Sequence, residues 1–132
     1  MELKGRVITC LVNQGYRVTD HGTDTGESVD FPLFAQKVVP HVLQGERAIL
    51  ICGTGLGMAM AANRHCGVRA ADCWNGEVAT LSRQHNDSNV LCLGARVMEP
   101  ALIESTVNAW LTTPFSGEER HQRRIKQLDE LN

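Results

Sequence analysis

Residues 48–57 read Ala48-Ile49-Leu50-Ile51-Cys52-Gly53-Thr54-Gly55-Leu56-Gly57. The first five are apolar without a break, which predicts a strand buried on both faces, as in a parallel sheet. The three glycines that follow predict a tight loop whose backbone can approach a ligand closely. Small apolar residues from 58 to 65 then predict a helix that packs on the sheet. Such a strand–loop–helix unit indicates an α/β fold, with a ligand site beyond the carboxyl end of the strand.

The rest of the chain continues this alternation of strands and helices. Apolar periodicity predicts helices at 3–12, 31–43, 76–84, 100–111 and 118–131, and strands at 16–20, 68–73 and 90–93. Pro40 is expected to kink the second helix or to end it early. The whole chain, residues 1–132, is therefore expected to form a single domain with a parallel sheet and right-handed crossovers.

Composition excludes several classes of protein. Hydrophobic residues make up 42% and charged residues 21%, which is typical of a globular chain rather than a disordered one. Thirteen Lys and Arg against fifteen Asp and Glu argue against nucleic-acid binding through bulk positive charge. The sequence has no apolar run of the roughly 20 residues that a membrane span needs, and its first residues lack a signal-peptide pattern. We expect a cytoplasmic protein that binds neither nucleic acid nor membrane.

The five cysteines are an odd number without a C-x-x-C pair, which favours neither a disulfide framework nor a zinc site. Four of them, Cys10, Cys66, Cys73 and Cys92, are expected to be buried, reduced thiols. Cys52 is the exception, because a thiol at the start of the glycine loop can serve as a base or a nucleophile.

The glycine loop alone does not decide the chemistry. It is neither G-x-G-x-x-G nor a P-loop, so a nucleotide-binding module is the least favoured function, and a plain tight turn stays an alternative. Two further segments carry chemical groups. Residues 82–87 place His85 and Asn86 at a helix end, and the basic run 120–126 puts Arg120 and Arg124 on one helix face, where they could clamp a phosphate. For both segments, a solvated surface is the alternative.

Together these motifs resemble ribose-5-phosphate isomerase B and the galactose-6-phosphate isomerase subunits. The resemblance covers essentially the whole chain and rests on residues 51–58, 81–91 and 93–97, with shorter matches at 20–23, 28–32 and 110–115. It implies a three-layer, Rossmann-like fold with a flavodoxin-like strand order and helices on both faces of the sheet. It also implies an aldose–ketose isomerase that works without metal or cofactor on a sugar phosphate, most of all on ribose 5-phosphate.

The resemblance assigns roles residue by residue. Cys52 would be the base that moves a proton between C1 and C2, Thr54 would help to hold the enediolate, and His85 would be the acid that opens the sugar ring. Substrate contacts would come from Gly53, Gly55, Leu56, Gly57, Asn86, Arg96, Arg120 and Arg124. Some of the arginines would come from a neighbouring subunit, so the resemblance implies a homodimer, or a dimer of dimers, with the site at its interface.

The sequence departs from this family at its start. Family members begin with a strand and an Asp-His-x-Gly motif, whereas this sequence opens on the helix that follows them. Asp20-His21-Gly22 aligns with the end of the second strand instead, so the role of the missing motif is not carried over to His21. Phe31 stands where a Tyr is common.

The missing strand should lie inside the sheet beside residues 16–20. We expect a start upstream or a truncated chain, rather than a partner chain that fills the gap. The departure motivates a second hypothesis, in which the protein binds a sugar phosphate without catalysis.

Overall fold

The computed structural model describes residues 2–22 and 30–131. The predicted Ser28-Val29 part of one family motif lies outside these residues. In chain order the elements are α1 (Glu2–Asn13), α2 (Phe31–Leu43), β1 (Ala48–Cys52), α3 (Leu56–Ala62), β2 (Ala70–Asp72), α4 (Gly76–Asn86), β3 (Val90–Gly94), a short 3-10 helix (Pro100–Leu102), α5 (Ile103–Thr112) and α6 (Glu119–Asp129). None of the described helices is long and apolar enough to cross a membrane.

The three strands form one parallel sheet in the order β1-β3-β2. The α/β class and the parallel sheet are confirmed. The flavodoxin-like order is wrong in one respect, because the last strand lies between the two earlier ones instead of beyond them. Burial explains this placement: all five residues of β3 are buried, whereas β2 ends in the charged Asp72 and is better suited to an edge.

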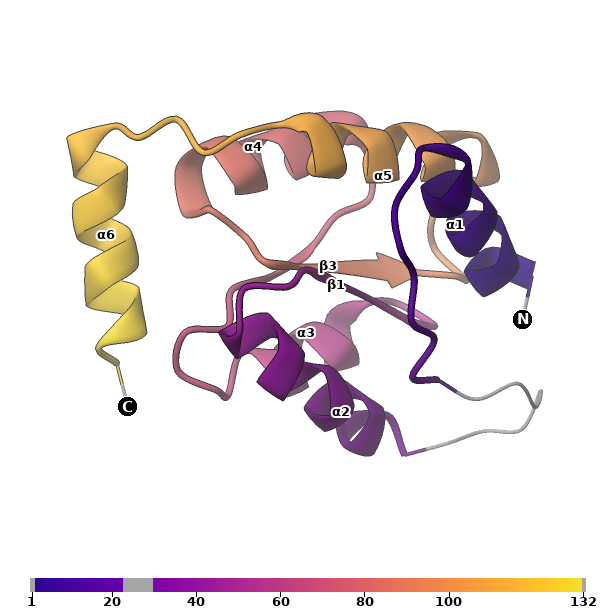
Figure 1. Cartoon of the computed structure of the whole chain (residues 1–132), viewed down its shortest axis with the longest axis horizontal. Coiled ribbons are helices and arrows are strands. Elements are labelled where there is room, and N and C mark those ends of the chain that lie inside the picture. The colour runs from indigo at the N-terminus through magenta and orange to yellow at the C-terminus, as the bar shows by residue number, and fades with distance from the viewer. Residues whose placement is uncertain (1, 23–29, 132) are drawn as a thin grey trace.

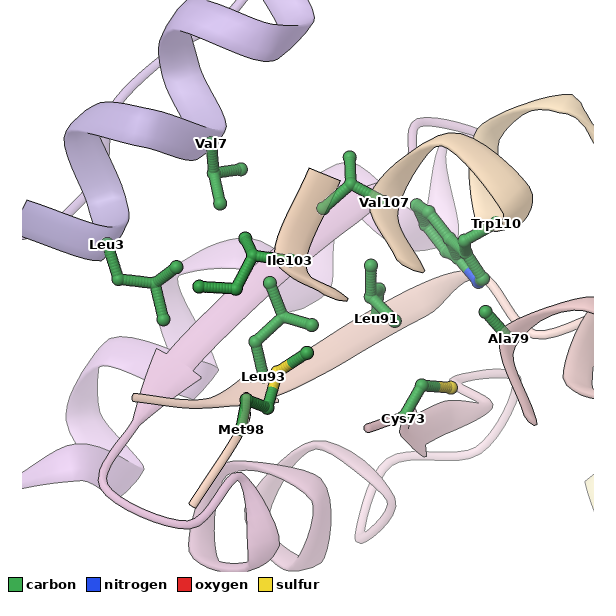
Figure 2. Packing of buried hydrophobic residues seen from close by; sticks show 10 residues of the cluster. All are labelled: Leu3, Val7, Cys73, Ala79, Leu91, Leu93, Met98, Ile103, Val107 and Trp110. Carbon is green, nitrogen blue, oxygen red and sulfur yellow. The ribbon is translucent and has the colours of Figure 1, made fainter. Parts of the chain in front are cut away.

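Helices cover both faces of the sheet and give three layers, as Figure 1 shows. On one face α1, α4 and α5 pack around Trp110 and Leu91, both of which are fully buried. Figure 2 shows Leu3 and Val7 of α1 meeting Ile103 and the α5 side chains over β3. On the other face α2 and α3 form a second apolar cluster against the opposite side chains of the same strands. The core is therefore split by the sheet into two halves.

Residues 16–20 were predicted to form a strand, and this prediction is wrong. The segment has no assigned secondary structure, and no described strand pairs with it. A cavity of about 640 Å³ separates it from β1, and apolar side chains such as Val7 of α1 and Val38 of α2 line that cavity. Without a neighbouring strand, the backbone groups of this segment have no ladder partners, so a β-favouring sequence alone does not make a strand.

Pro40 does not end the second helix early. Helix α2 runs through it to Leu43. The proline lies on the exposed face, as does Gln36, whose carbonyl loses its helical partner and can be hydrated instead. Val39 and Val42 on the opposite face are buried, and their packing holds the last turn in place.

The remaining boundaries differ by a few residues, as is common at element ends. Helix α3 begins at Leu56, two residues early, and β2 covers only Ala70–Asp72. Helix α4 extends to Asn86, so His85 and Asn86 lie in its last turn rather than after it. All five cysteines are free; Cys73 and Cys92 are buried as predicted, but Cys66 is exposed and Cys10 is only half-buried.

Candidate functional site

The glycine loop places the Cys52 thiol at the carboxyl end of β1. Cys52 is the last residue of the strand and is half-buried. Its Sγ accepts a hydrogen bond from the backbone N–H of Gly55 at 3.1 Å. Gly55 has a φ of +83°, a left-handed conformation that residues other than glycine adopt only with strain. The turn that brings this N–H to the sulfur therefore depends on glycine at position 55.

A second loop supports the first from the end of β3. The N–H of Ala95 donates to the Cys52 carbonyl at 2.8 Å, and the N–H of Arg96 donates to the Gly53 carbonyl at 2.9 Å. The Arg96 guanidinium lies directly over Gly53: a Cβ at that position would be 3.2 Å from its Nε. Gly53 thus leaves room for the arginine, and Arg96 belongs to the same half of the site as Cys52.

Phe31 also reaches this loop. Its ring would lie 2.8 Å from a Cβ added at Gly57, so the absence of a side chain at that position lets the ring cover the start of α3. Asp20 forms an ion pair with Lys4 at 2.9 Å and accepts a hydrogen bond from the Gly22 N–H. The hydrogen bond from the Lys4 ammonium, and after it that from Gly22, lowers the pKa of Asp20. His21 packs on the ring of His41, with 4.7 Å between centroids.

Asp72 is a neighbour of the loop that sequence reasoning missed. It ends β2, and its carboxylate would overlap a Cβ added at Gly55. Burial raises the pKa of Asp72, and no donor in the described part of the chain pairs with its oxygens. Its position at a strand end, like that of Cys52, was a signal that could have identified it.

The other predicted residues lie at the opposite edge of the sheet. His85 and Asn86 end α4, just before β3 begins. The Asn86 carbonyl accepts a hydrogen bond from Arg69, which precedes β2. Arg120 and Arg124 follow on α6, four residues apart and both exposed. In Figure 1, α6 lies beside the end of α4 that is farther from the β3 arrowhead.

The chain therefore divides its candidate site into two halves. Cys52 pairs in register with Gly94 at the carboxyl edge, whereas His85 precedes the strand that starts with Val90 at the amino edge. Five residues of strand span about 15 Å, so one chain does not bring the Cys52 thiol and the His85 ring into contact. Within one chain, these residues form two separate groups at opposite ends of the strands.

His121 is a second residue that sequence reasoning missed, because the arginines around it dominate the pattern. It is only 5% exposed, although it lies on a helix that is otherwise polar. Its ring stacks on that of His85 with centroids 4.4 Å apart and an interplanar angle of 19°. Burial lowers the pKa of His121, and the neighbouring His85, Arg120 and Arg124 act in the same direction, against Glu118.

Among residues 2–22 and 30–131, no three His, Cys, Asp or Glu side chains are placed to hold one ion.

Comparison with known proteins gives one consistent result. The sequence model of a family described as Ribose/Galactose Isomerase matches residues 1–128. Ribose-5-phosphate isomerase B of Escherichia coli is 44% identical over 96% of this chain and 85% of its own length. D-erythrulose-4-phosphate isomerase of Pectobacterium atrosepticum is 38% identical over 89% of this chain and 79% of its own. The crystal structure of a ribose 5-phosphate isomerase from Thermotoga maritima superposes with a TM-score of 0.93 at 47% identity, covering 98% of this chain and 90% of that one.

Proposed function

Because the chain belongs to the Ribose/Galactose Isomerase family, we propose that it interconverts ribose 5-phosphate and ribulose 5-phosphate in a site shared by two copies of the chain. The observation that carries the proposal is the Cys52 thiol, held against the amides of a glycine loop at the carboxyl edge of a parallel sheet. The relatives named for the five-carbon substrate support the choice of sugar.

Cys52 acts as the base that transfers a proton between C1 and C2. The hydrogen bond from the Gly55 N–H stabilises negative charge on the sulfur without neutralising it. A base at this position removes the C2 proton of the open-chain aldose to give an enediolate and returns this proton to C1, while the C2 hydroxyl gives up its proton and the C1 oxygen gains one. The ketose product then forms without net oxidation or reduction.

Loop amides stabilise the enediolate oxygen. The N–H groups of Thr54 and Gly57 have no acceptor among the described residues, whereas that of Leu56 is taken by the Thr54 hydroxyl. Fixed amides of this kind need no reorganisation when charge develops on the substrate, which makes them effective in the transition state. Arg96, which lies over Gly53, contributes positive charge to the same half of the site.

The second half comes from the other copy. His85 protonates the ring oxygen of the sugar, Asn86 binds hydroxyls, and Arg120 and Arg124 bind the phosphate. Exposed apolar side chains surround the Cys52 loop and support a second copy at this face: Leu56, Met60, Trp74 and Val97 are each more than half exposed. A two-fold dimer would place the amino-edge residues of each copy against the loop of its partner.

Activity on ribose 5-phosphate tests the proposal. The purified protein should form ribulose 5-phosphate, and Cys52→Ala should reduce kcat by at least about a hundredfold, since general-base catalysis contributes that much. Cys10→Ala is the matched control, because Cys10 is also half-buried but lies on α1, outside the loop. Equal activity in the parent and in Cys52→Ala removes Cys52 from its role.

A second candidate function is sugar-phosphate binding without turnover. The unpaired segment 16–20 and the cavity beside β1 favour it, because they leave the sheet open close to the loop. Calorimetric titration with ribose 5-phosphate distinguishes the two functions: binding without product formation supports the second, and measurable turnover excludes it.

A further inference from the structure

The side chain of His85 lies in the last turn of α4 and stacks on the ring of His121. Among the described residues, no hydrogen bond or ion pair holds its side chain, and its single ring contact is the stack on His121. An acid that protonates a ring oxygen must be held in one orientation, because small errors in geometry lower the rate strongly. The structure therefore leaves the orientation of His85 to His121.

His121 is an unusual residue to bury at this position. Its Nε2 lies 3.0 Å from a Glu118 carboxylate oxygen, yet this buried atom has no hydrogen-bond partner among the described residues. Burial of an unsatisfied polar atom is unfavourable, because the atom gives up its hydrogen bonds to water and gains none in return. A role in packing alone would be filled better by an apolar side chain.

Both rings are held from rigid elements. On the α4 side, the Gln84 carbonyl accepts the Ser116 N–H at 3.2 Å, beside the start of α6. At the other end of α6, Asp129 forms an ion pair with Arg69 at 3.0 Å. These contacts fix α6 against the end of α4, so the stack is a built feature of the fold rather than a chance meeting of surface side chains.

We infer that His121 is a positioning residue for His85: it holds the imidazole of the ring-opening acid in place by stacking on it. This inference rests on the proposed function, in which His85 is that acid. Two imidazolium rings 4.4 Å apart would repel each other, whereas a neutral ring accepts a cationic neighbour on its face.

Charged side chains lie on both helices that carry the stack. Burial lowers the pKa of His121, and Arg120 and Arg124 on its own helix lower it further, whereas Glu118 acts against them. On the α4 side, Arg83 is buried and forms an ion pair with Asp87 at 2.8 Å, so these two charges largely balance.

Two substitutions separate stacking from packing. His121→Phe keeps a flat ring of similar size, and His121→Ala removes it. For ribose 5-phosphate we expect His121→Ala to lower kcat by about tenfold or more with KM nearly unchanged, and His121→Phe to stay within about threefold of the parent. If both variants keep the parent kcat per folded protein, as measured beside the thermal melting curve, the inference is wrong.

A second measurement does not depend on activity. In the free protein, nuclear Overhauser contacts between protons of the two rings should be strong. Absence of these contacts overturns the inference even if the protein is an active isomerase. If the ring contacts are found but the protein does not convert ribose 5-phosphate, the proposed function is contradicted. The catalytic role of the stack is then contradicted as well.

Discussion

Gly55→Ala tests how the glycine loop is built, and its cost can be worked out from two separate terms. The first is the left-handed backbone at Gly55, with φ of +83°, which an L residue adopts at a cost of about 1–2 kcal/mol. The second is contact with Asp72, since the new Cβ would overlap its Oδ1 and lie 2.8 Å from its Cγ. Overpacking of this kind costs about 1–3 kcal/mol. The expected loss of unfolding free energy is about 2–5 kcal/mol.

Gly45→Ala is the matched control. Gly45 also has a positive φ, of +102°, but a Cβ there meets nothing within 4 Å. Its cost should be limited to the backbone term, about 1–2 kcal/mol. Asp72→Ala should remove the overlap with the new Cβ of Gly55→Ala. After the cost of Asp72→Ala alone is subtracted, the double variant should therefore lose about as much unfolding free energy as Gly45→Ala.

Urea unfolding followed by circular dichroism measures all four variants at one pH. For a domain of this size, 1 kcal/mol corresponds to roughly 4 °C in Tm, so Gly55→Ala should melt on the order of 8–20 °C below the parent. The reasoning is refuted if Gly55→Ala costs no more than Gly45→Ala, or if Asp72→Ala gives no relief.

Three shorter predictions concern the Asp72 carboxyl, two of the cysteines and the Trp110 indole. Burial raises the pKa of Asp72 above its ordinary value of 3.8, so the folded state binds the proton more tightly than the unfolded state does. The folded state therefore loses stability as the pH rises through this raised pKa. Asp72→Asn should be more stable than the parent at pH 7 and equal to it near pH 3, which unfolding at both pH values will show. Cys66 is exposed, whereas burial raises the pKa of the Cys73 thiol to about 11. In the folded protein, iodoacetamide at pH 8 should therefore modify Cys66 and spare Cys73. Equal rates of modification, measured by mass spectrometry, would contradict this. Trp110 donates its indole N–H to the buried Ser88 hydroxyl at 2.8 Å. Trp110→Phe should therefore lower the free energy of unfolding by about 1–3 kcal/mol. A change within experimental error in urea unfolding would show that this hydrogen bond contributes nothing to stability.

The parts of the fold that sequence predicted well are those fixed by local pattern and burial together. Residues 48–57 are the best example, because a continuous apolar run and three glycines leave few alternatives to a buried strand and a tight loop. Segment 16–20 shows the opposite case. Its residues favour a strand, but a strand also needs a neighbour, and the described chain supplies none.

The candidate site was predicted in its residue types but not in its geometry. The family resemblance assigns Cys52 and His85 to one site, whereas the topology places them at opposite ends of the parallel strands. That division follows from connectivity, since a residue before a parallel strand lies at its amino edge. His121 and Asp72 could not be singled out, because their significance lies in burial and in contacts between distant segments.

The central claim is that two copies complete one active site, and mixing two inactive variants tests it most directly. Cys52→Ala and His85→Asn should each be nearly inactive alone. Refolded together in equal amounts, about half of the dimers should be heterodimers, and each heterodimer should have one intact site of its two. The mixture should therefore show about a quarter of the parent activity on ribose 5-phosphate. Mixtures that stay as inactive as the separate variants, although heterodimers are shown to form, would contradict the shared site.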